Sequence, residues 1–153
     1  CSRILCLRSN SRMRMPANKR TDAYLDVVEQ AGLPALVREV EFVKPDDEKS
    51  AVVAKILDEN PDIDGIFAGD DTMAAICLNV MKQRGLSTPD DIKVVGADGA
   101  RRTMTFMPDL TTVRQDIDRI GELAAQSIIA LINGEKPESN IKLPVELIEG
   151  KTA

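Results

Sequence analysis

Short apolar runs and longer amphipathic segments alternate along the whole chain of 153 residues. The apolar runs are rich in Ile, Leu and Val, which is typical of buried strands, and they occupy residues 3–9, 36–43, 63–69, 92–98, 110–113 and 141–150. The amphipathic segments carry apolar residues at helical spacing, and they occupy residues 19–34, 46–60, 71–85 and 116–134. Residues 99–109 fit neither pattern and are predicted to be irregular. The alternation predicts a doubly wound α/β fold, in which helices cover both faces of a parallel sheet.

Polar residues follow three of the predicted strands, and in such sheets ligands bind beyond the carboxyl ends of the strands. The candidates are Ser9–Asn10, Asp70–Asp71 and Asp98–Gly99. Asp71 stands where a helix N-cap belongs, and a carboxylate there accepts hydrogen bonds from free N–H groups of the first turn. One cap needs only one carboxylate. We therefore predict that Asp71 caps the helix and that Asp70 faces a ligand.

Composition excludes several classes of function. The net charge of −5, the 3% content of aromatic residues and the absence of Trp argue against a basic nucleic-acid surface or a base-stacking platform. The basic residues near the start of the chain most simply form a solvated loop; they are Arg8, Arg12, Arg14, Lys19 and Arg20. With no His and no CxxC pair among three Cys, neither a zinc site nor a His-dependent triad is expected.

No feature of the sequence favours catalysis. The phosphate-binding patterns GxxxxGK[ST] and GxGxxG are both absent, and Cys77 lies within an apolar helix face. We therefore expect no enzyme, no catalytic residue and no cofactor. Carboxylates and an arginine that converge on one cleft instead suit the hydroxyl groups of a sugar, which they hold by charge-assisted hydrogen bonds. No apolar run has the length of a membrane span and no signal peptide opens the chain, so a cytoplasmic location is expected.

Three collinear segments carry a resemblance to a known family. They are KRTDAYLDVVEQAGLP, FAGDDTMAAICLNVMKQRGLSTPDDIKVVGADGA and PDLTTVRQDIDRIGELAAQSIIALINGE. Together they resemble the effector-binding core of the LacI/GalR family of bacterial transcriptional regulators. The resemblance implies a two-lobed core like the periplasmic binding proteins, a homodimer, and operator DNA bound by a separate helix-turn-helix headpiece. It also implies that a sugar effector between the lobes biases their relative orientation.

The resemblance assigns effector contacts to four residues. Arg20 matches the arginine of R-x-x-G-[YFW], and Asp98 matches the acid of V-V-G-[YF]-D. Gln115 matches the glutamine of L-T-T-[VI]-x-Q. Asp70 falls on the usual asparagine of N-D-x-M-A, and this replacement matters because a carboxylate accepts hydrogen bonds but cannot donate them. At two further positions, Ala23 replaces the family's glycine and Ala97 replaces its aromatic residue.

The resemblance also divides the chain. Residues 1–113 and 141–153 are expected to form the carboxy-terminal lobe, and the helix at 116–134 is expected to pack in an amino-terminal lobe. That lobe is mostly missing and the DNA-binding headpiece is absent, and the chain, which begins at Cys1, is expected to be a piece of a longer protein. The uncovered helix is therefore expected to drive self-association. The segment DGARRTMTFMPDLTTVRQ resembles sucrose- or fructoside-type repressors of the family, and this resemblance implies a sucrose or fructoside effector, with ribose second. A protein corepressor, or a periplasmic sugar-binding protein, is the alternative.

Overall fold

The structure, a computed structural model, describes residues 1–10, 16–41 and 43–153, so Arg12 and Arg14 of the basic cluster lie outside the described residues. Six strands form one sheet in the order β2-β1-β3-β4-β5-β6. Their bounds are β1 Ile4–Asn10, β2 Leu36–Glu41, β3 Gly65–Ala68, β4 Lys93–Asp98, β5 Thr111–Gln115 and β6 Val145–Ile148. The first five are parallel, as predicted, whereas β6 pairs antiparallel with β5. The predicted parallel sheet is therefore confirmed for the first five strands, and β6 departs from it because the chain returns to β5 from the far end of the preceding helix.

Five helices connect the strands of the described chain. They are α1 Pro16–Gln30, α2 Asp46–Glu59, α3 Asp71–Gln83, α4 Arg101–Phe106 and α5 Ile117–Ile132. Helix α1 begins at Pro16 rather than Lys19, and proline suits the first turn because its missing N–H would have no partner there. Helix α4 shows that the prediction of an irregular segment at 99–109 is wrong. A helix this short presents too few turns for a periodic pattern to stand out.

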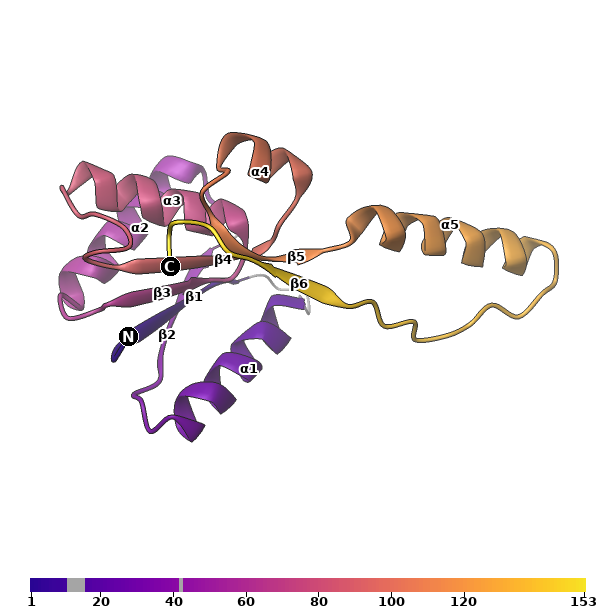
Figure 1. Ribbon diagram of the computed structural model, residues 1–153, viewed down its shortest axis with the longest axis horizontal. Helices are drawn as coiled ribbons and strands as arrows, with labels where there is room; N and C mark the ends of the chain where they lie inside the picture. Colours follow the sequence, from indigo (N-terminus) through magenta and orange to yellow (C-terminus); the bar gives the residue numbers. More distant parts are fainter. Residues whose placement is uncertain (11–15, 42) are drawn as a thin grey trace.

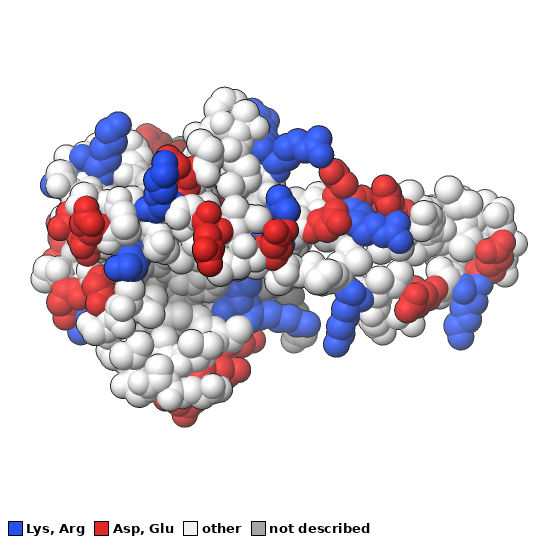
Figure 2. All heavy atoms as spheres, in the orientation of Figure 1, with Lys and Arg blue, Asp and Glu red and all other residues white. Residues whose placement is uncertain are grey.

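Helix α5 and the segment that returns from it, residues 117–144, project away from the rest of the molecule. We call this part the α5 arm and the remainder the body (Figure 1). No residue of α5 is buried, so its apolar face is exposed as expected. Acidic and basic side chains are interspersed over the face shown in Figure 2, in the arm and in the body alike. Among the described residues, no helix is both long and apolar enough to cross a membrane.

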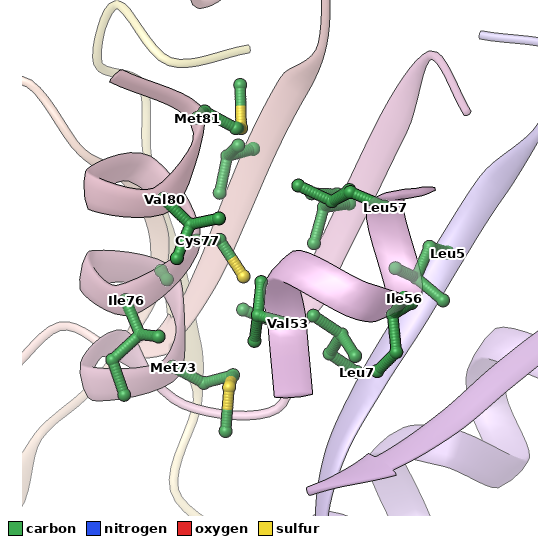
Figure 3. Close-up of a cluster of buried hydrophobic side chains, with 14 of the residues drawn as sticks. Leu5, Leu7, Val53, Ile56, Leu57, Met73, Ile76, Cys77, Val80 and Met81 are labelled. Carbon is green, nitrogen blue, oxygen red and sulfur yellow. The ribbon is translucent and has the colours of Figure 1, made fainter. Parts of the chain in front are cut away.

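Helices α2 and α3 cover one face of the sheet and α1 covers the other, which confirms the predicted doubly wound arrangement. Alternate residues of β1 serve the two faces, because successive side chains of a strand point in opposite directions. Leu5 and Leu7 pack with α2 and α3, whereas Cys6 packs with Tyr24 and Val28 of α1. In Figure 3, side chains of α2 fill the space between α3 and β1.

The end of the chain is tied into the body. The hydroxyl of Thr152 accepts from the N–H of Thr111 at 2.9 Å and donates to the carbonyl of Val94 at 2.7 Å. The N–H of Val94 in turn donates to the carbonyl of Thr152 at 2.6 Å. Thr152 therefore bridges β4 and β5 near their first residues. This end of the sheet is opposite to the carboxyl ends of the strands, which are predicted to bind a ligand.

Candidate functional site

The strand order places the expected ligand-binding position of an α/β sheet beside β1. The chain runs from β1 to β2 on one side and then crosses over to β3 on the other side, so the direction of the strand order reverses at β1. In open α/β sheets the crevice at such a point, beyond the carboxyl ends of the strands, is where ligands bind. Ser9 at the end of β1 and Asp70 after β3 meet there, and the Ser9 hydroxyl donates to Oδ2 of Asp70 at 3.3 Å.

Helix α1 brings Arg20 to the same end of the sheet. One turn further along α1, the Tyr24 hydroxyl donates to the carbonyl of Ile4 at 2.7 Å and accepts from the N–H of Leu36 at 3.1 Å. These bonds fix α1 against β1 and β2. Residues four apart lie on one helix face, so Arg20 extends from the anchored face of α1.

Three of the four residues with predicted effector contacts are in direct contact. Oδ1 of Asp98 accepts from Nη2 of Arg20 at 2.5 Å and from Nε2 of Gln115 at 2.7 Å. The other terminal nitrogen of Arg20, Nη1, donates to the carbonyl of Gly69 at 2.5 Å. Side chains from α1, β4 and β5, far apart in the sequence, thus converge on one carboxylate.

This cluster is partly open to solvent. The side chains of Arg20 and Asp98 are 24% and 35% exposed. Both of these bonds to Asp98 use Oδ1, and among the described residues no hydrogen-bond donor reaches Oδ2. Because an ionised carboxylate accepts through both oxygens, the described residues leave Oδ2 available to accept from the hydroxyl of a bound molecule.

Of the two adjacent aspartates, Asp70 rather than Asp71 caps helix α3. Asp70 has extended backbone (φ −154°, ψ 170°), and its Oδ1 accepts from the N–H of Met73 at 2.8 Å, so Asp70 is the N-cap of α3. The prediction that Asp71 caps this helix is wrong. A cap must precede the first helical residue, and the helix begins at Asp71. Either carboxylate satisfies the sequence pattern, which therefore could not decide between them.

Asp71 is buried instead, at 3% exposure. Its Oδ2 accepts from the N–H of Gly99 at 2.8 Å, and its Oδ1 accepts from the hydroxyl of Thr112 at 2.6 Å. Burial raises the pKa of Asp71, and the hydrogen bonds from Thr112 and Gly99 act against that rise. This role of Asp71 was not predicted from the sequence, although Gly96 is a signal for it. A Cβ on Gly96 would lie 2.5 Å from Oδ1 of Asp71, so only glycine at position 96 leaves room for the carboxylate.

The backbone at Asp98 is strained. Asp98 has φ +115°, a conformation that residues with a Cβ rarely adopt. The next residue, Gly99, has φ +58° and packs so closely on β5 that a Cβ would lie 2.6 Å from Cα of Arg114. This sharp turn directs the Asp98 side chain toward Arg20 and Gln115.

Gln115 also lines two hollows at the base of the α5 arm. One, of about 420 Å³, lies between α5 and the returning segment and is lined by Ile120, Leu123 and Val145, among others. The other, of about 750 Å³, lies beside α4 and includes Arg101 and Arg114. The cluster around Asp98 is therefore continuous with the junction between body and arm.

Comparisons with known proteins agree with this architecture. A family model for a periplasmic binding protein-like domain matches residues 1–153. The chain is 32% identical over 139 residues to a ribose operon repressor of Halalkalibacterium halodurans, a match that covers 90% of this chain and 41% of the repressor. It is 33% identical over 140 residues to a sucrose operon repressor of Pediococcus pentosaceus, which covers 90% of this chain and 43% of that protein.

A solved structure is similar as well. It is a LacI family transcriptional regulator from Arthrobacter sp. FB24 in complex with lactose, with a TM-score of 0.82 at 25% identity; the match covers 99% of this chain and 57% of that chain. The chain spans less than half the length of the two curated relatives.

Proposed function

This chain belongs to the periplasmic binding protein-like family of LacI-type regulators, and we propose that it contributes the carboxy-terminal wall of a sugar-effector site. In this proposal residues 1–113 and 141–153 form the carboxy-terminal lobe, and the α5 region packs in an amino-terminal lobe. Operator DNA is bound by a headpiece outside this chain, in a homodimer that works in the bacterial cytoplasm. The effector shifts the relative orientation of the lobes and so changes DNA binding.

The convergence of Arg20, Asp98 and Gln115 carries the proposal. The three side chains come from three different elements, and they meet beyond the carboxyl ends of the strands, where α/β sheets bind their ligands. A carboxylate flanked by guanidinium and amide donors suits vicinal hydroxyl groups, which both donate and accept hydrogen bonds. Asp70 lies at the same strand ends and is the fourth proposed contact, because its Oδ2 is engaged only by the Ser9 hydroxyl among the described residues.

The proposed ligand is an uncharged sugar, and the site binds it without catalysing a reaction. The relatives are named for ribose and sucrose operons, and the structural neighbour was solved with lactose. We propose a sucrose or fructoside effector first and ribose second, as the sequence after Asp98 suggests. No covalent chemistry is required of Arg20 or Asp98 in this role; they orient the sugar and replace its hydration.

A nuclear magnetic resonance titration of this chain tests the proposal. Sucrose, fructose, ribose and lactose are added separately to ¹⁵N-labelled protein, because amide shifts detect even the weak binding expected of one wall of a cleft. We expect one sugar to shift the signals of Gly69, Asp98, Gly99 and Gln115. Arg20→Ala removes one charge-assisted donor and should weaken that binding by about tenfold or more.

The control variant is Arg84→Ala. Arg84 also pairs with an aspartate, Asp58, at 2.8 Å, and its side chain is 28% exposed, close to the 24% of Arg20. It lies at the end of α3, away from the proposed site, so its loss should leave sugar binding unchanged. If none of the sugars shifts these signals, the sugar proposal fails and a protein corepressor takes its place. If both variants weaken binding equally, Arg20 has no specific role.

A further inference from the structure

The buried carboxylate of Asp71 crosses over strand β4. Asp71 begins α3, and its Oδ1 reaches the hydroxyl of Thr112 in β5, on the far side of β4. It passes above Gly96, the register partner of Thr112, where a Cβ would come within 2.5 Å of this oxygen. Asp71, Gly96 and Thr112 thus form a connection from α3 to β5, and we call it the Asp71 bridge.

Both ends of the bridge adjoin residues of the candidate site. Oδ2 of Asp71 accepts from the N–H of Gly99, the residue that follows the strained Asp98. Thr112 lies three positions before Gln115 on the same strand, and Gln115 donates to Asp98. The bridge therefore holds the backbone on both sides of the bond between Gln115 and Asp98.

Capping α3 does not account for Asp71, because Asp70 already caps this helix. Burial of a carboxylate is unfavourable unless hydrogen bonds compensate for the lost hydration. Here the compensating donors are Gly99 and Thr112, so the group stays buried only while the turn after β4 and strand β5 keep their positions. A non-glycine residue at positive φ likewise persists only where its surroundings enforce it.

We propose that Asp71 is a positioning residue for the effector site. Through the Gly99 amide and the Thr112 hydroxyl it holds Asp98 in its strained conformation, so that the Asp98 carboxylate meets Arg20 and Gln115. The consequence for sugar binding rests on the proposed function. The consequence for the arrangement of the three side chains does not, since it concerns the ligand-free chain.

The test uses conservative variants of the bridge. Thr112→Val keeps the shape of the side chain and removes its hydroxyl, whereas Thr112→Ser retains the hydroxyl. Asp71→Asn retains the acceptor for Gly99, and its amide nitrogen faces the Thr112 oxygen, which can accept. The control is Thr111→Val, which removes a neighbouring buried hydroxyl of β5 that accepts from Gly150 rather than bonding Asp71.

The first readout is the ligand-free spectrum of each folded variant. In Thr112→Val we expect altered signals for the Gly99 amide, the Gln115 side-chain amide and the Arg20 guanidinium. The separate variants Thr112→Ser and Asp71→Asn should each retain all three signals, and Thr111→Val should leave them as in the original chain. If Thr112→Val lowers the melting temperature but leaves these three signals in place, Asp71 is merely structural and the proposal is overturned.

The second readout is the affinity for whichever of the four sugars binds the original chain. Loss of one hydrogen bond to a charged group at the bridge should raise Kd by about tenfold in Thr112→Val, with recovery in Thr112→Ser. An unchanged Kd overturns the positioning role even if the signals move. If no sugar binds the original chain, the proposed function fails, and the ligand-free spectra still decide the arrangement of Asp98.

Discussion

Helix α3 lies in the body and helix α5 lies in the arm, and both carry apolar residues at helical spacing. Helix α3 buries its apolar face, which includes Met73, Cys77 and Met81, against α2 and the sheet. Helix α5 buries no residue, and Leu131 is 61% exposed. The comparison shows that spacing along the chain determines where a helix forms and which face is apolar. Burial depends on a partner surface, which α3 has and α5 lacks.

The sharpest test of this contrast replaces one leucine in each region. Leu7 of β1 is fully buried, and Leu7→Ala should lower the free energy of unfolding by about 3 kcal/mol because it leaves a cavity in the core. Leu131→Ala removes the same atoms from an exposed position and should change it by less than about 0.5 kcal/mol. Urea denaturation followed by circular dichroism, at a concentration at which the chain is monomeric, measures both.

An equal effect of the two substitutions would show that Leu131 is covered in solution. At higher concentration we expect a second copy of the chain to cover Leu131, because an exposed apolar helix face of this kind favours self-association. Light scattering then checks the expectation independently: a particle that stays monomeric at all concentrations would contradict it.

The two aspartate N-caps allow a finer comparison. Asp70 caps α3 through the N–H of Met73, and Asp116 caps α5 through the N–H of Arg119. Asp70→Ala should lower the free energy of global unfolding by about 1 kcal/mol, since α3 unfolds together with the core. Asp116→Ala should leave it unchanged and only increase fraying of α5, because α5 makes no buried contacts with the body.

Hydrogen exchange distinguishes the two effects. Amide protection should fall throughout the body in Asp70→Ala and only within α5 in Asp116→Ala. Ser at either position accepts the same bond and should restore most of the loss. A global loss of protection in Asp116→Ala would mean that the arm unfolds cooperatively with the body.

The same distinction explains what could be predicted from the sequence. The strands and long helices of the body were predictable because apolar periodicity is a local property. The antiparallel direction of β6 was not, since it depends on where the α5 arm ends in space. The resemblance to LacI/GalR regulators singled out Arg20, Asp98 and Gln115, and the structure brings these three into contact. That Asp70 rather than Asp71 caps α3 escaped prediction, because it depends on a one-residue difference in where α3 begins.

The smallest expected effect concerns the pH dependence that the buried Asp71 gives to the body. Burial raises the pKa of Asp71 in the folded chain above its ordinary value of 3.8. The folded state therefore binds this proton more tightly than the unfolded state does. The stabilisation from the protonated carboxyl is fully present below pH 3.8 and is lost as the pH rises through the folded-state pKa.

Asp71→Asn removes this titration while it keeps the shape of the side chain. The difference in unfolding free energy, original chain minus Asp71→Asn, should therefore fall as the pH rises from about 3.8 and become constant above the folded-state pKa. Urea denaturation of both proteins between pH 3 and pH 8 measures it. A difference that instead grows with pH would mean that the bonds from Thr112 and Gly99 outweigh burial, so that Asp71 is held as a stabilised anion. Protonation of Asp71 at low pH would then weaken the Asp71 bridge. The body would lose the arrangement at Asp98 as the carboxylate took up its proton.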